Sequence, residues 1–129
     1  MSRPDSIEMR WIVTHDRERN LISVESSGTL TVETVKGMIA EILKAADAYQ
    51  CNRFLIDHRH ADIQMSVSEI YNRPAEMNKL NLPSGWRLAI LYSQKDAEVF
   101  HFYKNVTLNR GLPINVFTDA DEATAWLIS

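Results

Sequence analysis

Hydrophobic and polar residues alternate in two short segments near the start of the chain, residues 9–14 and 21–26. A period of two residues places alternate side chains on opposite faces and predicts β-strands. The connecting residues 15–20 are all polar. The two segments therefore predict an antiparallel hairpin, and Ser26-Ser27-Gly28 predicts the end of its second strand.

The spacing of the apolar residues becomes helical from Val32 to Ala46, where they recur every three or four positions. This pattern predicts an amphipathic helix. Thr31 is its expected N-cap. Gly37 weakens a helix relative to alanine, which suggests a close packing contact at that position.

Three further helical patterns follow. The first covers residues 66–80, begins with the capping-box sequence Ser66-Val67-Ser68-Glu69 and contains Pro74, which is expected to kink or divide it. The second covers residues 96–110, with Gly111 as its stop. The last begins after Thr118, where three acidic residues lie in the expected first turn.

Short apolar runs separate these helices at residues 54–56, 88–92 and 114–117. Such runs are typical of strands that are buried on both faces of a parallel sheet. The predicted order is β-β-α-β-α-β-α-β-α. We therefore expect an α/β fold with a mixed, mostly parallel sheet and an N-terminal antiparallel hairpin.

Composition and length agree with a globular chain. With 129 residues and 45% hydrophobic residues, we expect one domain over residues 1–129, with residues 1–8 as a flexible tail. A net charge of −3 argues against nucleic-acid binding, which needs basic surfaces. Cys51 is the only cysteine, and no apolar run is long enough to cross a membrane or resembles a signal peptide. A cytoplasmic location is expected.

Ionisable residues are densest directly after the predicted strand 54–56, in the sequence Asp57-His58-Arg59-His60-Ala61-Asp62. Ligands of open α/β sheets bind beyond the carboxyl ends of strands, which also nominates residues 93–96 and 118–119. Asp57, His58, His60 and Asp62 are possible metal ligands, but their spacing fits no established zinc signature. Asp57 with a nearby histidine is a possible acid–base pair. A solvated loop explains the same residues, so we predict no metal, no cofactor and no catalytic residue.

Several longer stretches together resemble the SpoIIAA-like proteins of the STAS group. The similarity extends over nearly the whole chain from Met9 onward. It is carried by the opening hairpin and by Phe54–Asp57, Ser68–Tyr71, Leu82–Ile90, Phe102–Val106, Asn109–Gly111, Val116–Asp119 and Glu122–Leu127. The resemblance implies a sheet of four or five strands packed by helices, in a small bacterial regulatory or ligand-binding domain without known catalysis.

Two site hypotheses follow from this resemblance. Anti-sigma-factor antagonists of the group carry a phosphorylated serine at the start of a helix, and Ser66 is the nearest equivalent, with Ser68 two residues later. The Asp-Ser-Ser-Gly type of sequence around that serine is absent here, and helix capping also explains Ser66. The group is also related to lipid-carrying Sec14-type domains, which implies an apolar pocket near Pro74.

These arguments give a ranked set of expectations. The first is a non-catalytic binding or regulatory domain, the second a carrier of an apolar small molecule or lipid, and the third a hydrolase or metal enzyme using Asp57, His58 and His60. Aromatic residues in excess of one helical stripe indicate a dimer contact or the wall of an apolar pocket, and a homodimer is expected. The expected ligand-binding residues are Asp57, Val67, Ile70, Tyr71, Met77 and Leu82.

Overall fold

The computed structural model describes residues 8–129, so the predicted flexible tail lies outside it except for Glu8. In chain order the elements are β1 (Arg10–Asp16), β2 (Leu21–Leu30), α1 (Val32–Tyr49), β3 (Arg53–Ile63), α2 (Val67–Met77), β4 (Arg87–Leu91), the short 3₁₀ turn η1 (Gln94–Asp96), α3 (Ala97–Asn109), β5 (Ile114–Phe117) and α4 (Ala120–Ile128). Apart from η1, this is the predicted order of strands and helices.

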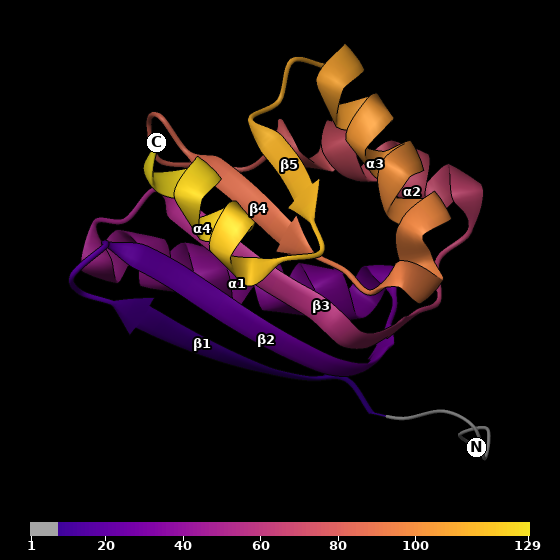
Figure 1. The fold of residues 1–129 in the computed structure, drawn as a ribbon, viewed down its shortest axis with the longest axis horizontal. Coiled ribbons are helices and arrows are strands. Elements are labelled where there is room, and N and C mark those ends of the chain that lie inside the picture. Colours follow the sequence, from indigo (N-terminus) through magenta and orange to yellow (C-terminus); the bar gives the residue numbers. More distant parts are fainter. Residues whose placement is uncertain (1–7) are drawn as a thin grey trace.

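The five strands form one sheet in the order β1-β2-β3-β4-β5 (Figure 1). Strands β1 and β2 are antiparallel, and every later neighbouring pair is parallel. The fold class predicted from the sequence is therefore confirmed. In β1, Trp11 and Val13 are half-buried while Arg10, Ile12 and Thr14 are exposed, as the alternation predicts.

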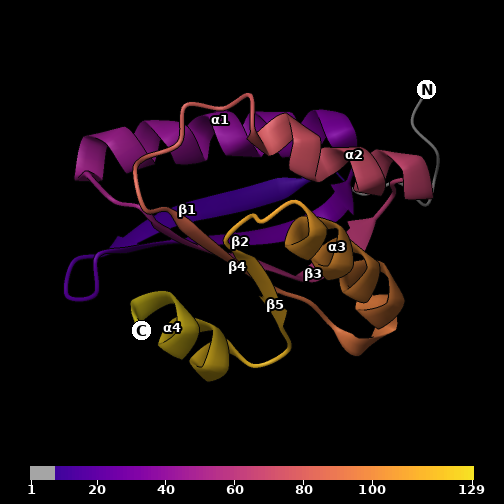
Figure 2. The same ribbon diagram turned by 90° about the horizontal axis from the view of Figure 1, so that it is seen from above.

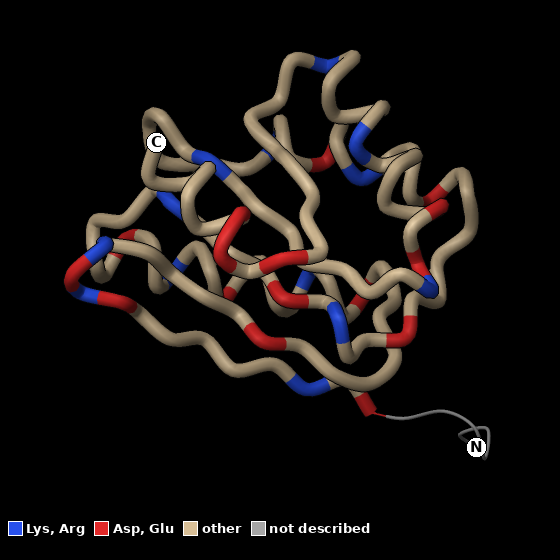
Figure 3. Tube along the Cα trace, viewed as in Figure 1, with Lys and Arg blue, Asp and Glu red and all other residues tan. Residues whose placement is uncertain are grey.

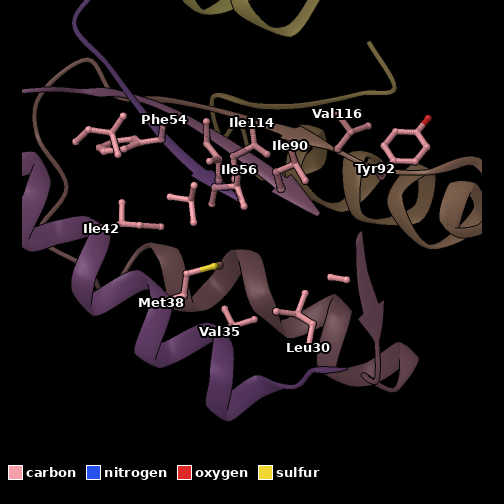
Figure 4. Packing of buried hydrophobic residues seen from close by; sticks show 14 of the residues in the cluster. Leu30, Val35, Met38, Ile42, Phe54, Ile56, Ile90, Tyr92, Ile114 and Val116 are labelled. Atoms are coloured by element: carbon pink, nitrogen blue, oxygen red, sulfur yellow. The ribbon is translucent and has the colours of Figure 1, made fainter. Parts of the chain in front are cut away.

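Helices cover both faces of the sheet (Figure 2). Strand β4 shows the reason, because its side chains alternate between two cores: Leu88 and Ile90 pack with α1 and α3, whereas Ala89 and Leu91 pack with α4. In the larger core, side chains from α1 such as Met38 and Ile42 face apolar side chains of the sheet (Figure 4).

Helix α1 begins as the sequence predicts. The Thr31 hydroxyl accepts a hydrogen bond from the Thr34 amide at 3.3 Å, and the Thr34 hydroxyl accepts one from the Thr31 amide at 2.8 Å. This reciprocal pair satisfies two amides that a helix start leaves without partners. A Cβ added at Gly37 would lie 3.5 Å from the Trp11 ring, an ordinary contact, so packing does not demand a glycine there.

The predicted break at Ser26-Ser27-Gly28 is wrong, because β2 continues to Leu30. The pairing between β2 and β3 shifts register between Glu25 and Ser27, so a β-bulge absorbs the irregular sequence within the strand. Gly28 has φ +90°, and a Cβ there would collide with the Glu8 backbone carbonyl. Glycine is thus used inside the strand rather than at its end.

The predicted loop after Asp57 is also wrong. Strand β3 extends to Ile63, and its second half pairs with β2 through Gly28–Ala61 and Leu30–Ile63. Strand β4 pairs with β3 only as far as Asp57–Leu91. Within residues 8–129, the ionisable sequence is therefore a strand whose far half has a neighbouring strand on one side only, which explains its polar composition.

Helix α2 contains Pro74 without being divided. Proline deprives the carbonyl four residues earlier of its partner; here that carbonyl belongs to Ile70, and the helix still continues beyond Pro74 to Met77. Leu80, which the sequence places on the helical stripe, lies beyond the helix. Pro74 itself is almost fully buried.

Candidate ligand-binding cavity

A cavity of about 390 Å³ lies between the sheet and the three helices α1, α2 and α3. Helix α2 packs against α3, and the two views show it displaced toward one end of the sheet rather than lying flat on it (Figures 1 and 2). Native cores leave few voids of this size. The volume lies within the range of pockets that hold small molecules.

The wall of the cavity is predominantly apolar. The sheet contributes one side, helix α1 a second, and α2 with the following loop and α3 the others. Its aliphatic, sulfur-containing and aromatic residues include Leu30, Val35, Met38, Ile39, Ile42, Leu43, Phe54, Ile56, Ile63, Met65, Ile70, Met77, Leu80, Leu82, Trp86, Leu88, Ile90, Val99, Phe100 and Tyr103.

Charged and exposed residues mark the mouth of the cavity. Lys36 and Ala40 of α1 and Lys79 after α2 line the cavity and are exposed to solvent. Lys79 forms an ion pair with Glu76 at 3.2 Å. The cavity therefore opens between α1 and the end of α2.

Three of the six predicted ligand-binding residues line this cavity, namely Ile70, Met77 and Leu82. Val67 and Tyr71 do not, because they lie on the outer side of α2, where they are 71% and 51% exposed. The Tyr71 ring instead lies beneath the guanidinium of Arg110, 5.5 Å from its centroid. These two positions correct the predicted lining.

Asp57 also lies away from the cavity. Its carboxylate accepts hydrogen bonds from the Arg59 side chain at 2.9 and 2.8 Å and from the Arg59 amide at 3.0 Å. Burial alone would raise the pKa of Asp57, but these bonds outweigh it and hold the pKa below its usual value. Glu25 and Asp119 act on the same guanidinium, and acidic segments gather here in β2, β3 and the start of α4 (Figure 3).

His58 points to the other face of the sheet and lines the cavity, with only 5% of its surface exposed. Its Nδ1 lies 2.6 Å from the Ser26 hydroxyl, and that hydroxyl donates to the Asp57 carbonyl at 3.0 Å. Burial lowers the pKa of His58 to about 4, although the nearby Asp57 carboxylate opposes the shift. The imidazole is therefore neutral near pH 7.

The structure does not bring Asp57, His58 and His60 together as one chemical site. Adjacent residues of a strand point to opposite faces, which separates the Asp57 carboxylate from the His58 ring. His60 is exposed and lines a shallow hollow beside Trp11 and Glu41. Among residues 8–129, no group of three potential metal ligands is present.

Ser66 and Ser68 lie at the exposed start of α2. The Ser66 hydroxyl accepts a hydrogen bond from the Glu69 amide at 3.2 Å, and the Glu69 carboxylate accepts one from the Ser66 amide at 2.9 Å. The predicted capping box is therefore present. The two serine hydroxyls lie 3.2 Å apart, at hydrogen-bond distance of each other, and both serines are exposed on the helix that covers the cavity.

The sequence alone did not identify most of the cavity wall. From the sequence, His58 is a candidate metal ligand, acid–base group or loop residue. Helix α1 is a packing helix, and an aromatic face that includes α3 is a candidate dimer contact or pocket wall. Phe100 and Tyr103 carried a signal, because their spacing on α3 predicts an inward face. No local pattern indicates that α2 stands away from the sheet.

Comparison with known proteins adds evidence on the fold. No family model matches the sequence, and no curated protein matches it. The structure resembles an anti-sigma factor antagonist from Mycobacterium paratuberculosis, with a TM-score of 0.61, 16% identity and full coverage of both chains. It also resembles an uncharacterized protein of the DUF3478 family with a SpoIIAA-like fold from Shewanella loihica PV-4, with a TM-score of 0.60, 19% identity and coverage of 98% and 99%.

These likenesses establish the fold. The chain has a SpoIIAA-like fold, with the mostly parallel five-stranded sheet and N-terminal hairpin described above. The resemblance inferred from the sequence is confirmed at this level. Within residues 8–129, none of the helices is both long and apolar enough to span a bilayer.

Proposed function

We propose that this protein is a non-catalytic, STAS-like binding domain of the cytoplasm that takes up a small apolar molecule and thereby performs a regulatory or carrier role. The observation that carries the proposal is the apolar cavity of about 390 Å³ beneath α2. Filling such a cavity removes apolar ligand surface from water, which contributes a favourable free energy of roughly 25 cal/mol per Å² buried. The likeness to an anti-sigma factor antagonist supports the regulatory part of the proposal.

A tryptophan that fills the cavity tests this function. We expect Met77→Trp to weaken binding of the uncharged fluorescent dye N-phenyl-1-naphthylamine by at least about tenfold, because the indole takes the space of the ligand. Val67→Trp is the matched control, since Val67 lies on the outer side of the same helix and is 71% exposed. A wild-type protein that neither binds the dye nor carries an apolar molecule in native mass spectrometry would contradict the proposal.

We also infer a homodimer, or a complex with a protein partner, through the outer side of α2. Val67 and Tyr71 lie one helical turn apart there and are both exposed. A partner bound to this side would also meet Ser66 and Ser68, whose phosphorylation stays a prediction. Because α2 covers the cavity, such a partner would be sensitive to its occupancy. The molar mass in solution tests the dimer.

A further inference from the structure

Among the predominantly apolar residues of the cavity wall, His58 is a buried side chain whose ring nitrogens can donate or accept hydrogen bonds; the Tyr103 hydroxyl is a second buried polar group of the wall. The hydrogen bonds around the His58 ring determine which nitrogen carries the proton. The Ser26 hydroxyl has one hydrogen, which it donates to the Asp57 carbonyl at 3.0 Å, since a carbonyl only accepts. The same hydroxyl oxygen must then accept the 2.6 Å hydrogen bond from His58 Nδ1. Nδ1 is therefore protonated.

The backbone explains why Ser26 makes this bond. It lies at the register shift between Glu25 and Ser27, where the ladder between β2 and β3 is interrupted next to Asp57. A bulge disturbs the ladder locally, and here the Ser26 hydroxyl donates to the Asp57 carbonyl beside the register shift. Ser26 is itself 3% exposed, so water does not compete for this hydroxyl.

In a neutral imidazole with a proton on Nδ1, Nε2 is an acceptor. Nε2 receives no hydrogen bond within residues 8–129, yet it is not among the buried polar atoms that lack a partner, which are His15 Nδ1, Ser93 Oγ and Asp96 Oδ2. Nε2 thus keeps accessible surface. In a residue that lines the cavity and is 5% exposed, that surface faces the cavity.

We propose that the ligand is an uncharged apolar molecule bearing a hydroxyl group, which donates a hydrogen bond to His58 Nε2. This inference rests on the proposed function and specifies the chemistry of its ligand. A hydroxyl group can donate a hydrogen bond to the lone pair of His58 Nε2, whereas an ether or a carboxylate can only accept one. The alternative ligand is an anionic chain held at the mouth by Lys36 and Arg73, neither of which forms an ion pair with a described residue.

Two probes with the same numbers of carbon and oxygen atoms test the inference: octan-1-ol, which donates a hydrogen bond, and heptyl methyl ether, which does not. We expect the purified wild-type protein to bind the alcohol about tenfold more tightly in calorimetry, the range expected for one buried hydrogen bond. In His58→Phe this preference should disappear while binding of the ether persists. In Ser26→Ala the preference should weaken, because Nδ1 loses the acceptor that fixes the tautomer.

The outcomes separate the inference from the proposed function. Equal binding of both probes to the wild type would overturn the role of His58 and leave the apolar carrier standing, whereas binding of neither would overturn both. Octanoate binding more tightly than the alcohol, in wild type and His58→Phe alike, would place the polar group at the mouth and overturn the inference. Nitrogen NMR of the wild type adds a measurement free of mutation. A proton on Nδ1 and a response of Nε2 to octan-1-ol are expected, and a proton on Nε2 would contradict the assignment.

Discussion

At the scale of single residues, His58 and Asp57 are adjacent in sequence but lie in two different environments. Both are ionisable neighbours in β3, but strand geometry sends their side chains to opposite faces. Asp57 keeps its charge beside the Arg59 guanidinium at 2.8 Å, while His58 loses its charge among apolar residues. The chemistry that the sequence gathers in one short stretch is thus divided between an acidic outer surface and an apolar cavity.

The burial of neutral His58 predicts a pH dependence of stability. Its pKa is about 4 in the folded protein and about 6.5 when unfolded, so between these values the unfolded state binds more protons and stability falls as the pH falls. The free energy of unfolding of the wild type, measured with urea, should decrease relative to that of His58→Phe by about 2–3 kcal/mol from about pH 7 to about pH 4.5. The subtraction cancels the other titrating groups that both proteins share. A difference that does not change with pH would show that His58 is solvated or charged in the native state.

At the scale of elements, α2 is the helix on which the proposed function depends. It has the capping box that the sequence predicts, and it contains Pro74 without being divided. Few of its residues are buried, namely Ile70 and Pro74. A helix with so little buried surface depends more on its ends for stability than a core helix does.

Removing the cap of α2 should therefore be measurable. Ser66→Ala is expected to lower the free energy of unfolding by about 1 kcal/mol, because the Glu69 amide loses its acceptor. It should also speed hydrogen exchange of the first α2 amides. Ser68→Ala is the matched control, because within residues 8–129 its hydroxyl contacts only that of Ser66, and its expected effect is a few tenths of a kcal/mol. Equal losses in both variants would mean that the cap does not hold this helix.

At the scale of the whole molecule, the two faces of the sheet differ in how completely they are filled. Helix α4 covers one face completely: its Ala123 and Leu127 are fully buried against Leu21, Ala89 and Leu91 in the smaller of the two cores. On the other face α1 and α3 pack on the sheet, and α2 bridges the remaining space. The cavity is therefore a consequence of how three helices share one face.

The same arrangement leaves the outer side of α2 available for self-association. Light scattering of the wild type is expected to give twice the 14.8 kDa chain mass, and Tyr71→Glu should return the protein to a monomer because a charge at the centre of the contact must be desolvated. Thr14→Glu, on the exposed face of β1, is the control and should stay dimeric. A wild-type monomer at high concentration would remove the dimer and leave the cavity proposal unaffected.

The sequence by itself determined the order of strands and helices, the N-cap of α1, the capping box of α2 and the inward faces of β1, α1 and α3, because periodicity and caps act over a few neighbouring residues. The sequence predicted that strands end near Gly28 and Asp57. In the structure, pairing between β2 and β3 extends both strands beyond these residues. Only the tertiary structure decided that α2 stands away from the sheet, that Val67 and Tyr71 face outward, and that the Ser26 hydroxyl lies against His58 Nδ1. Each of these depends on contacts between segments far apart in the chain, which no local pattern encodes.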